Sequence, residues 1–136
     1  KKLRLFNFST YKKYNSRINV EKNRLLKILN KYKKKRLKIY GFGAPAKLTT
    51  FSYVFGIKKT FFKAIVDDNI LKQKLYTPGK KIPIISYQKF TQKNFDVILV
   101  FAWNFSTPIV LRLRKDFKNK KKKIIIPFPK VKVIKC

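Results

Sequence analysis

The stretch IYGFGAPA at residues 39–46 decides the fold that this sequence predicts. A short apolar run at 37–40 leads directly into two glycines, and residues 45–55 can continue as a helix. Pro45 is tolerated in the first turn of that helix, and Gly56 can end it. The spacing Gly41-x-Gly43-x-x-Ala46 fits the G-x-G-x-x-G/A fingerprint of turns that hold a phosphate at a helix start.

Each residue of this fingerprint has a physical reason. Gly41 allows the tight turn, Gly43 lets the backbone approach a phosphate, and Ala46 lets the helix pack close to the strand. Asp67 ends the next apolar run, near the usual offset of about 20 residues for a carboxylate that binds ribose hydroxyls. The alternative is a tight turn in which the glycines serve geometry alone and Asp67 is a capping or surface residue.

The chain outside this turn alternates between strand and helix patterns. We expect strands at 37–40, 61–66, 82–85, 97–101 and 124–126, and helices at 20–35, 45–55 and 107–118, with Ser86 capping a brief additional helix. Such alternation predicts a parallel sheet with right-handed crossovers. The predicted fold class is therefore α/β: a Rossmann-like three-layer sandwich with a mostly parallel sheet, preceded by a helical arm. Residues 1–19 are interpreted as a linker or surface arm, and residues 20–136 as one domain.

Polar residues follow two of the predicted strands. Those after the second strand are Asp68, Asn69, Lys72, Gln73, Tyr76 and Thr77, and those after the strand at 97–101 are Trp103 and Asn104. In open α/β sheets, ligands bind beyond the carboxyl ends of the strands. Trp103 could stack on a base or sugar ring and Asn104 could bind a hydroxyl, with core packing as the alternative role for Trp103.

Four blocks of the sequence resemble one known family. They read IYGFGAPAKLTTFSYVFGI (39–57), VDDNILKQKLYTPGKKIPI (66–84), VILVFAWNF (97–105) and IIIPFPKVKVI (124–134). Together they resemble the C-terminal, Rossmann-like domain of the S-adenosylmethionine-dependent nucleotide-sugar C-methyltransferases. The resemblance implies a domain that closes over a site for a nucleotide-linked deoxysugar. It also implies a zinc-binding domain and a methyltransferase domain that are missing from this chain and present in cis or in trans.

The resemblance assigns site residues in three groups and no catalytic or metal-binding residue. The phosphate-side turn would comprise Gly41, Gly43, Ala44, Pro45, Lys47 and Thr50; the second loop Asp68, Asn69, Lys72, Gln73, Tyr76, Thr77, Pro78 and Gly79; the third loop Trp103 and Asn104. S-adenosylmethionine and zinc would be held by the missing domains, so this chain alone is expected to be inactive.

The sequence also departs from the family pattern. Leu48 and Lys74 stand at positions where the family has glycine, Thr49 replaces an asparagine, and Lys80 replaces a threonine. Leu48 is expected to narrow the pocket.

Composition excludes several function classes. The chain has 136 residues, no histidine and one cysteine, Cys136. A Ser-His-Asp or Cys-His site cannot be built from this chain alone, and neither a disulfide framework nor a Cys-based zinc site is expected. The longest apolar run, 97–103, is far shorter than the ~20 residues that span a bilayer. With no signal-peptide pattern visible, a cytoplasmic location without a membrane span is expected.

The net charge of +31 permits a second class of function. A nucleic-acid or polyanion binding module on a Rossmann-like scaffold is the alternative to sugar-nucleotide binding. The excess of Lys, Asn, Ile, Phe and Tyr is also what a strongly A/T-biased genome produces, and this drift is the favoured explanation. A degenerate domain kept as a structural or interaction unit is a third hypothesis. The runs Lys33–Arg36, Lys58–Lys59 and Lys120–Lys123 precede strands, which predicts a lysine-rich face opposite the ligand edge.

Overall fold

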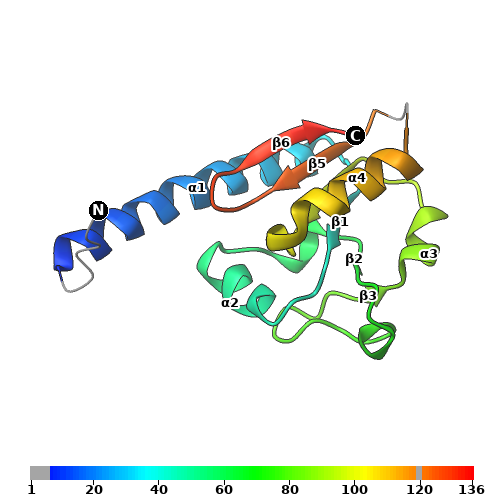
Figure 1. Cartoon of the computed structure of the whole chain (residues 1–136), viewed down its shortest axis with the longest axis horizontal. Helices are drawn as coiled ribbons and strands as arrows, with labels where there is room; N and C mark the ends of the chain where they lie inside the picture. Colours follow the sequence, from blue (N-terminus) through cyan, green and yellow to red (C-terminus); the bar gives the residue numbers. More distant parts are fainter. Residues whose placement is uncertain (1–6, 119–120) are drawn as a thin grey trace.

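Six strands form one sheet in the order β3-β2-β1-β4-β5-β6. Figure 1 shows the computed structural model, which describes residues 7–118 and 121–136 of the chain. The strands are β1 (Ile39–Phe42), β2 (Ile65–Val66), β3 (Ile84–Ile85), β4 (Val97–Val100), β5 (Lys123–Ile126) and β6 (Lys132–Lys135). β1 to β5 pair in parallel, and β6 pairs antiparallel with β5. The predicted mostly parallel sheet is confirmed.

Helices cover both faces of this sheet. The α-helices are α1 (Phe8–Lys34), α2 (Lys47–Val54), α3 (Tyr87–Thr91) and α4 (Ser106–Asp116); the 3₁₀ turns are η1 (Lys59–Phe61), η2 (Ile70–Lys72) and η3 (Trp103–Phe105). Buried side chains of α1 and α2 share one apolar cluster with the sheet, and those of α3 and α4 share the other. The fold is therefore the predicted three-layer, Rossmann-like sandwich.

The two central strands divide their side chains between these two layers. Ile39 of β1 packs toward α1 and α2, whereas Tyr40 and Phe42 pack toward α3 and α4. All four residues of β1 and all four of β4 are buried. Strands covered on both faces read as continuous apolar runs, which is why the run at 97–101 was recognisable in the sequence.

The first helix begins much earlier than expected. A start at residue 20 was predicted, but α1 already begins at Phe8, where the Asn7 side chain accepts a hydrogen bond from the Ser9 N–H at 3.0 Å. Residues 8–19 are almost entirely exposed. Apart from Ile18, which packs against the apolar cluster, their side chains face mostly solvent, so no buried stripe marked this segment as a helix. The described part of the predicted linker is helical, and residues 1–6 lie outside the described residues.

The last strand was not predicted at all. β6 is only four residues long, has a lysine at each end with two apolar residues between them, and follows a segment that contains Pro127 and Pro129. It returns antiparallel to β5, with Ile124 opposite Ile134. Other boundaries shift by a few residues: β1 runs two residues further into the glycine turn, and η1 occupies part of the apolar run expected as β2. The predicted brief helix is α3, with the Ser86 hydroxyl accepting from the Lys89 N–H at 3.1 Å.

Candidate functional site

The two glycines of the fingerprint are required by close contacts within the chain. A Cβ on Gly41 would lie 2.7 Å from the Phe101 ring and 2.9 Å from Ile65. Gly43 has a φ of +84°, and its Cβ would lie 2.6 Å from the Cβ of Ala102. The turn after β1 therefore passes directly against the residues that follow β4. The packing of the fold therefore requires glycine at both positions, independently of any ligand of the turn.

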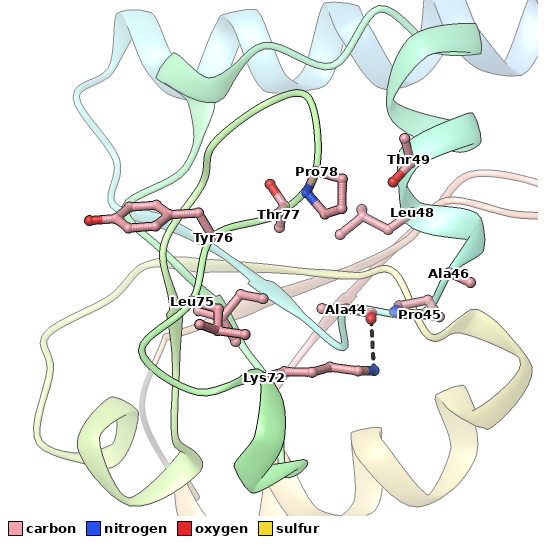
Figure 2. A pocket seen from close by; sticks show the side chains of 11 residues that line it. Ala44, Pro45, Ala46, Leu48, Thr49, Lys72, Leu75, Tyr76, Thr77 and Pro78 are labelled. Carbon is pink, nitrogen blue, oxygen red and sulfur yellow. Dashed lines mark hydrogen bonds between the residues drawn. The ribbon is translucent and has the colours of Figure 1, made fainter.

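Asp67 ties this turn to the loop that follows β2. The Asp67 side chain is 12% exposed. Its Oδ2 accepts a hydrogen bond from the backbone N–H of Ala44 at 2.6 Å, and its Oδ1 accepts one from the N–H of Asn69 at 2.8 Å. The Lys72 Nζ lies 3.7 Å from the same Oδ2 and donates to the carbonyl oxygen of Ala44 at 2.9 Å (Figure 2). The carboxylate thus holds two backbone segments together, and its proposed contact with a ribose stays a prediction.

A cavity of about 380 Å³ lies between the start of α2 and this second loop. It is lined by Ala44, Pro45, Ala46, Leu48, Thr49, Lys72, Leu75, Tyr76, Thr77, Pro78 and Ile84. Six of these were predicted as site residues: Ala44, Pro45, Lys72, Tyr76, Thr77 and Pro78. The lining is mostly apolar, with the Lys72 ammonium at one side beneath Ala44 and the Tyr76 hydroxyl pointing away from the other side chains (Figure 2).

Leu48 lines this cavity, and the narrowing of the pocket expected from it stays a prediction. Leu48 is buried and belongs to the apolar cluster beneath α1 and α2. Thr49, Leu75 and Ile84 also line the cavity and were not predicted as site residues. Ile84 pairs with the second loop, its N–H donating to the Leu75 carbonyl at 2.9 Å. That pairing depends on tertiary structure and leaves no motif in the sequence.

Several predicted residues of the second loop are engaged by the loop itself. The Thr77 hydroxyl accepts from the Ile82 N–H at 3.0 Å, and the Gln73 amide donates to the Asp67 carbonyl at 3.1 Å. The Asn69 side chain accepts from the Leu71 N–H at 3.0 Å and caps η2. These contacts fix the loop's shape beside the cavity.

Two other predicted residues of this loop contact neighbouring elements. Asp68 forms an exposed ion pair with Arg112 of α4 at 2.7 Å. Gly79 has a φ of +70°, and a Cβ there would lie 2.7 Å from the hydroxyl of Tyr53. The second loop is therefore attached to α4 on one side and to α2 on the other.

The third predicted group lies apart from the cavity lining. Trp103 is half-buried between Phe51 and Phe128, with ring centroids 5.1 Å and 5.6 Å away. The Lys47 Nζ lies 3.9 Å from the centroid of the Trp103 ring. Asn104 and Thr50 are exposed. Trp103 thus takes part in core packing, and Lys47 places a cation beside it at the start of α2.

One polar network fixes α3 against α4. The Tyr87 hydroxyl donates to Asp116 at 2.6 Å, and the Arg112 guanidinium lies 3.5 Å from the centroid of the Tyr87 ring. Burial, followed by the hydrogen bond to Asp116, raises the pKa of Tyr87 well above its usual 10. The Arg112 guanidinium that stacks on Tyr87 also forms the ion pair with Asp68, so this network helps to fix the position of that ion pair.

The described lysines of the three predicted runs precede strands, and none of them lines the cavity; a single lysine-rich face stays a prediction. The Lys33 Nζ donates to the Thr60 hydroxyl at 2.9 Å, next to η1 and ahead of β2. Lys123 begins β5, with its Nζ 4.9 Å from the Tyr32 ring. Lys120, which belongs to the predicted run, lies outside the described residues.

Among residues 7–118 and 121–136, no group of three or more His, Cys, Asp or Glu side chains could hold a metal ion. No helix in these ranges is both long enough and apolar enough to cross a membrane.

The molecule is a Rossmann-like α/β domain with a cavity of about 380 Å³ at the carboxyl edge of its sheet. The chain belongs to the C-methyltransferase C-terminal domain family, whose model matches residues 1–129. It is similar to the C-methyltransferase NovU of Streptomyces niveus, with 30% identity over 96 residues. That match covers 71% of this chain and 23% of NovU, so the chain corresponds to about a quarter of the relative's length.

Proposed function

We propose that this chain is the nucleotide-sugar binding domain of a C-methyltransferase, with the S-adenosylmethionine site and the catalytic groups on a part of the enzyme outside these residues. The observation that carries the proposal is the cavity of about 380 Å³ at the start of α2. Cavities of this size, mostly apolar with a few polar groups, are typical small-molecule sites. This one also lies at the sheet edge where open α/β folds bind ligands.

The contacts around the turn indicate where a diphosphate would lie. The Ala44 N–H is already bonded to Asp67, so this part of the turn is occupied by the chain's own carboxylate. Among the described residues, the N–H groups of Ala46 and Lys47 make no hydrogen bond. The Lys47 side chain, whose Nζ lies over Trp103, and the Lys72 side chain, which donates to the Ala44 carbonyl, add positive charge around this turn. We propose that the diphosphate lies at the start of α2 and that the apolar cavity takes the base or the sugar ring.

Catalysis is assigned elsewhere because the chain lacks the groups that would carry it. It contains no histidine, and the cavity is lined by no carboxylate or thiol. Methyl transfer needs a positioned donor, a positioned acceptor and usually a base. We therefore expect no methyl transfer by this chain alone. Its place of action is proposed to be the cytoplasm, where the single free Cys136 stays reduced.

Titration calorimetry tests the proposed binding directly. A thymidine-diphosphate deoxysugar should bind the chain, and Ala46→Leu should weaken binding at least tenfold, or about 1.4 kcal/mol, by filling the exposed entrance of the cavity. Gln88→Leu, at an exposed position of α3, is the matched control and should bind like the wild type. Equal affinity of the Ala46 variant and the wild type would place the ligand elsewhere. Absence of binding with both proteins would refute the proposal.

A further inference from the structure

Two adjacent carboxylates at the start of the second loop bond in different directions. The Asp67 carboxylate accepts a hydrogen bond from the Ala44 N–H of the glycine-rich turn at 2.6 Å, whereas the Asp68 carboxylate accepts one from the Arg112 guanidinium of α4 at 2.7 Å. Further along the loop, Lys72 lines the cavity and donates to the Ala44 carbonyl (Figure 2). The start of this cavity wall is therefore bonded to the turn on one side and to α4 on the other.

The Arg112 side chain is held in place by more than its ion pair. Its guanidinium lies 3.5 Å from the centroid of the Tyr87 ring, and the Tyr87 hydroxyl donates to Asp116 at 2.6 Å. Exposed ion pairs usually contribute little, partly because two long side chains must lose their freedom to form one geometry. Here the buried Tyr87 ring already restricts the arginine through a cation–π contact. Arg112 thus presents a positioned cation to Asp68.

The first part of the second loop, residues 68–73, has few other attachments to α4. In the part of the chain that the structure describes, no other hydrogen bond or ion pair joins this segment to α4. The Asn69 cap of η2 and the Gln73 amide bond fix the internal shape of the loop. Apolar packing adds little, because Ile70 and Leu71 are 81% and 83% exposed. The placement of this segment against α4 therefore depends on the pair of Asp68 with Arg112.

We propose that Arg112 is a positioning residue for the cavity. It holds residues 68–73 against α4 and thereby keeps Lys72 beside the Ala44 carbonyl, where this lysine forms one side of the ligand site. Arg112 does not line the cavity, so it acts through the loop and not through contact with the ligand. The effect on ligand binding rests on the proposed function, whereas the effect on the loop does not.

Amide hydrogen exchange of the whole chain tests the effect on the loop without any ligand. Arg112→Ala should raise the exchange rates in residues 69–73 about threefold or more and leave those of β4 unchanged. Salt screens exposed charges, so salt at about 1 M should narrow the difference between this variant and the wild type. Arg114→Ala, which removes another exposed arginine of α4, should exchange like the wild type. Unchanged exchange in Arg112→Ala would overturn the proposal, whether or not the chain binds a nucleotide-sugar.

Titration calorimetry with a thymidine-diphosphate deoxysugar tests the effect on the cavity. Arg112→Ala should weaken binding about three- to fivefold, the range that an ion pair of this kind can supply, and Arg114→Ala should not change it. The double variant Asp68→Arg with Arg112→Asp restores the pair with reversed charges and should recover most of the affinity. Loss of affinity in Arg112→Ala with no recovery in the double variant would mean direct contact with the ligand and would overturn the proposal. Absence of binding by the wild type would refute the proposed function, and hydrogen exchange would still decide the role of Arg112.

Discussion

Asp67 and Ala44 are joined by a hydrogen bond of 2.6 Å, from the backbone N–H of the glycine-rich turn to a carboxylate at the end of β2. In a dinucleotide-binding turn, backbone N–H groups of this kind face a phosphate. Here one of them is bonded to the chain's own anion. The arrangement links the loop after β1 to the loop after β2, and these two loops form the walls of the cavity.

Removal of this carboxylate should destabilise the domain. Asp67→Ala leaves the N–H groups of Ala44 and Asn69 without their partner, at a cost of about 1–3 kcal/mol in the free energy of unfolding. Asp67→Asn keeps one acceptor oxygen and should fall between alanine and the wild type. Urea denaturation measures the difference. The control is Asp68→Ala, whose exposed ion pair with Arg112 should contribute no more than about 1 kcal/mol. Equal stability of the two alanine variants would contradict the role given to Asp67.

Gly43 and Ala102 should be energetically coupled. Gly43→Ala places a methyl group 2.6 Å from the Cβ of Ala102 and forces an L-residue to a φ of +84°, so we expect a loss of about 2–4 kcal/mol. Ala102→Gly removes the steric overlap but not the unfavourable φ. The double variant should therefore recover part of the loss, which a double-mutant cycle measures. If the losses in unfolding free energy of the two single variants simply add in the double variant, the overlap between the residue 43 methyl group and Ala102 is not what destabilises Gly43→Ala.

Replacement of Lys74 by glycine should stabilise the folded chain. Its φ is +67°, in the left-handed region that costs an L-residue about 1–2 kcal/mol. This is also one of the two positions at which the resembling family has glycine. Lys74→Gly should stabilise the chain by about 0.5–1 kcal/mol, the left-handed cost less the extra chain entropy of glycine. The melting temperature reports the change. Lys58→Gly, at an exposed extended position with a φ of −100°, should have the opposite sign.

The raised pKa of Tyr87 should lower the free energy of unfolding at alkaline pH. Burial and the hydrogen bond to Asp116 raise its pKa above 10, so the folded chain keeps this proton while the unfolded chain loses it. The contribution of Tyr87 is then fully present below about pH 10 and declines as the pH rises further. Tyr87→Phe should cost about 1–2 kcal/mol at neutral pH through loss of the hydrogen bond.

Denaturation at several pH values separates this effect from simple packing. The difference in unfolding free energy between wild type and Tyr87→Phe should narrow above about pH 10. A difference that stays constant across this range would mean that the hydroxyl proton is not retained by the fold.

The central sheet was predictable because its signals are local. The glycine spacing at 41 and 43, the apolar run at 97–100 and the cap at Ser86 each depend on a few neighbouring residues. The first turns of α1 were not predictable, since no element of the domain covers them and their apolar residues mix with lysines on the exposed sides. β6 was missed because its four residues gain their regular structure from pairing with β5.

The site was predictable as a meeting of loops, but the partners of its side chains were not. Parallel strands bring the segments after β1 and β2 to one edge, where the Lys72 side chain donates to the Ala44 carbonyl. Asp67, Gln73 and Thr77 bond mainly to backbone groups, and a backbone partner leaves no residue-specific pattern in the sequence. Leu75 and Ile84 line the cavity through a pairing that only the folded chain contains.

The two edges of the sheet have a consequence for solubility. Beside β3, the loop residues Lys74 and Leu75 already bond to both the carbonyl and the N–H of Ile84, so that edge offers little free backbone. Within the described residues, β6 pairs only with β5, but it is short and has Lys132 and Lys135 at its ends. A strand from another copy adding to this edge would bring lysine against lysine. The lysine-rich composition thus protects the β6 edge from edge-to-edge aggregation.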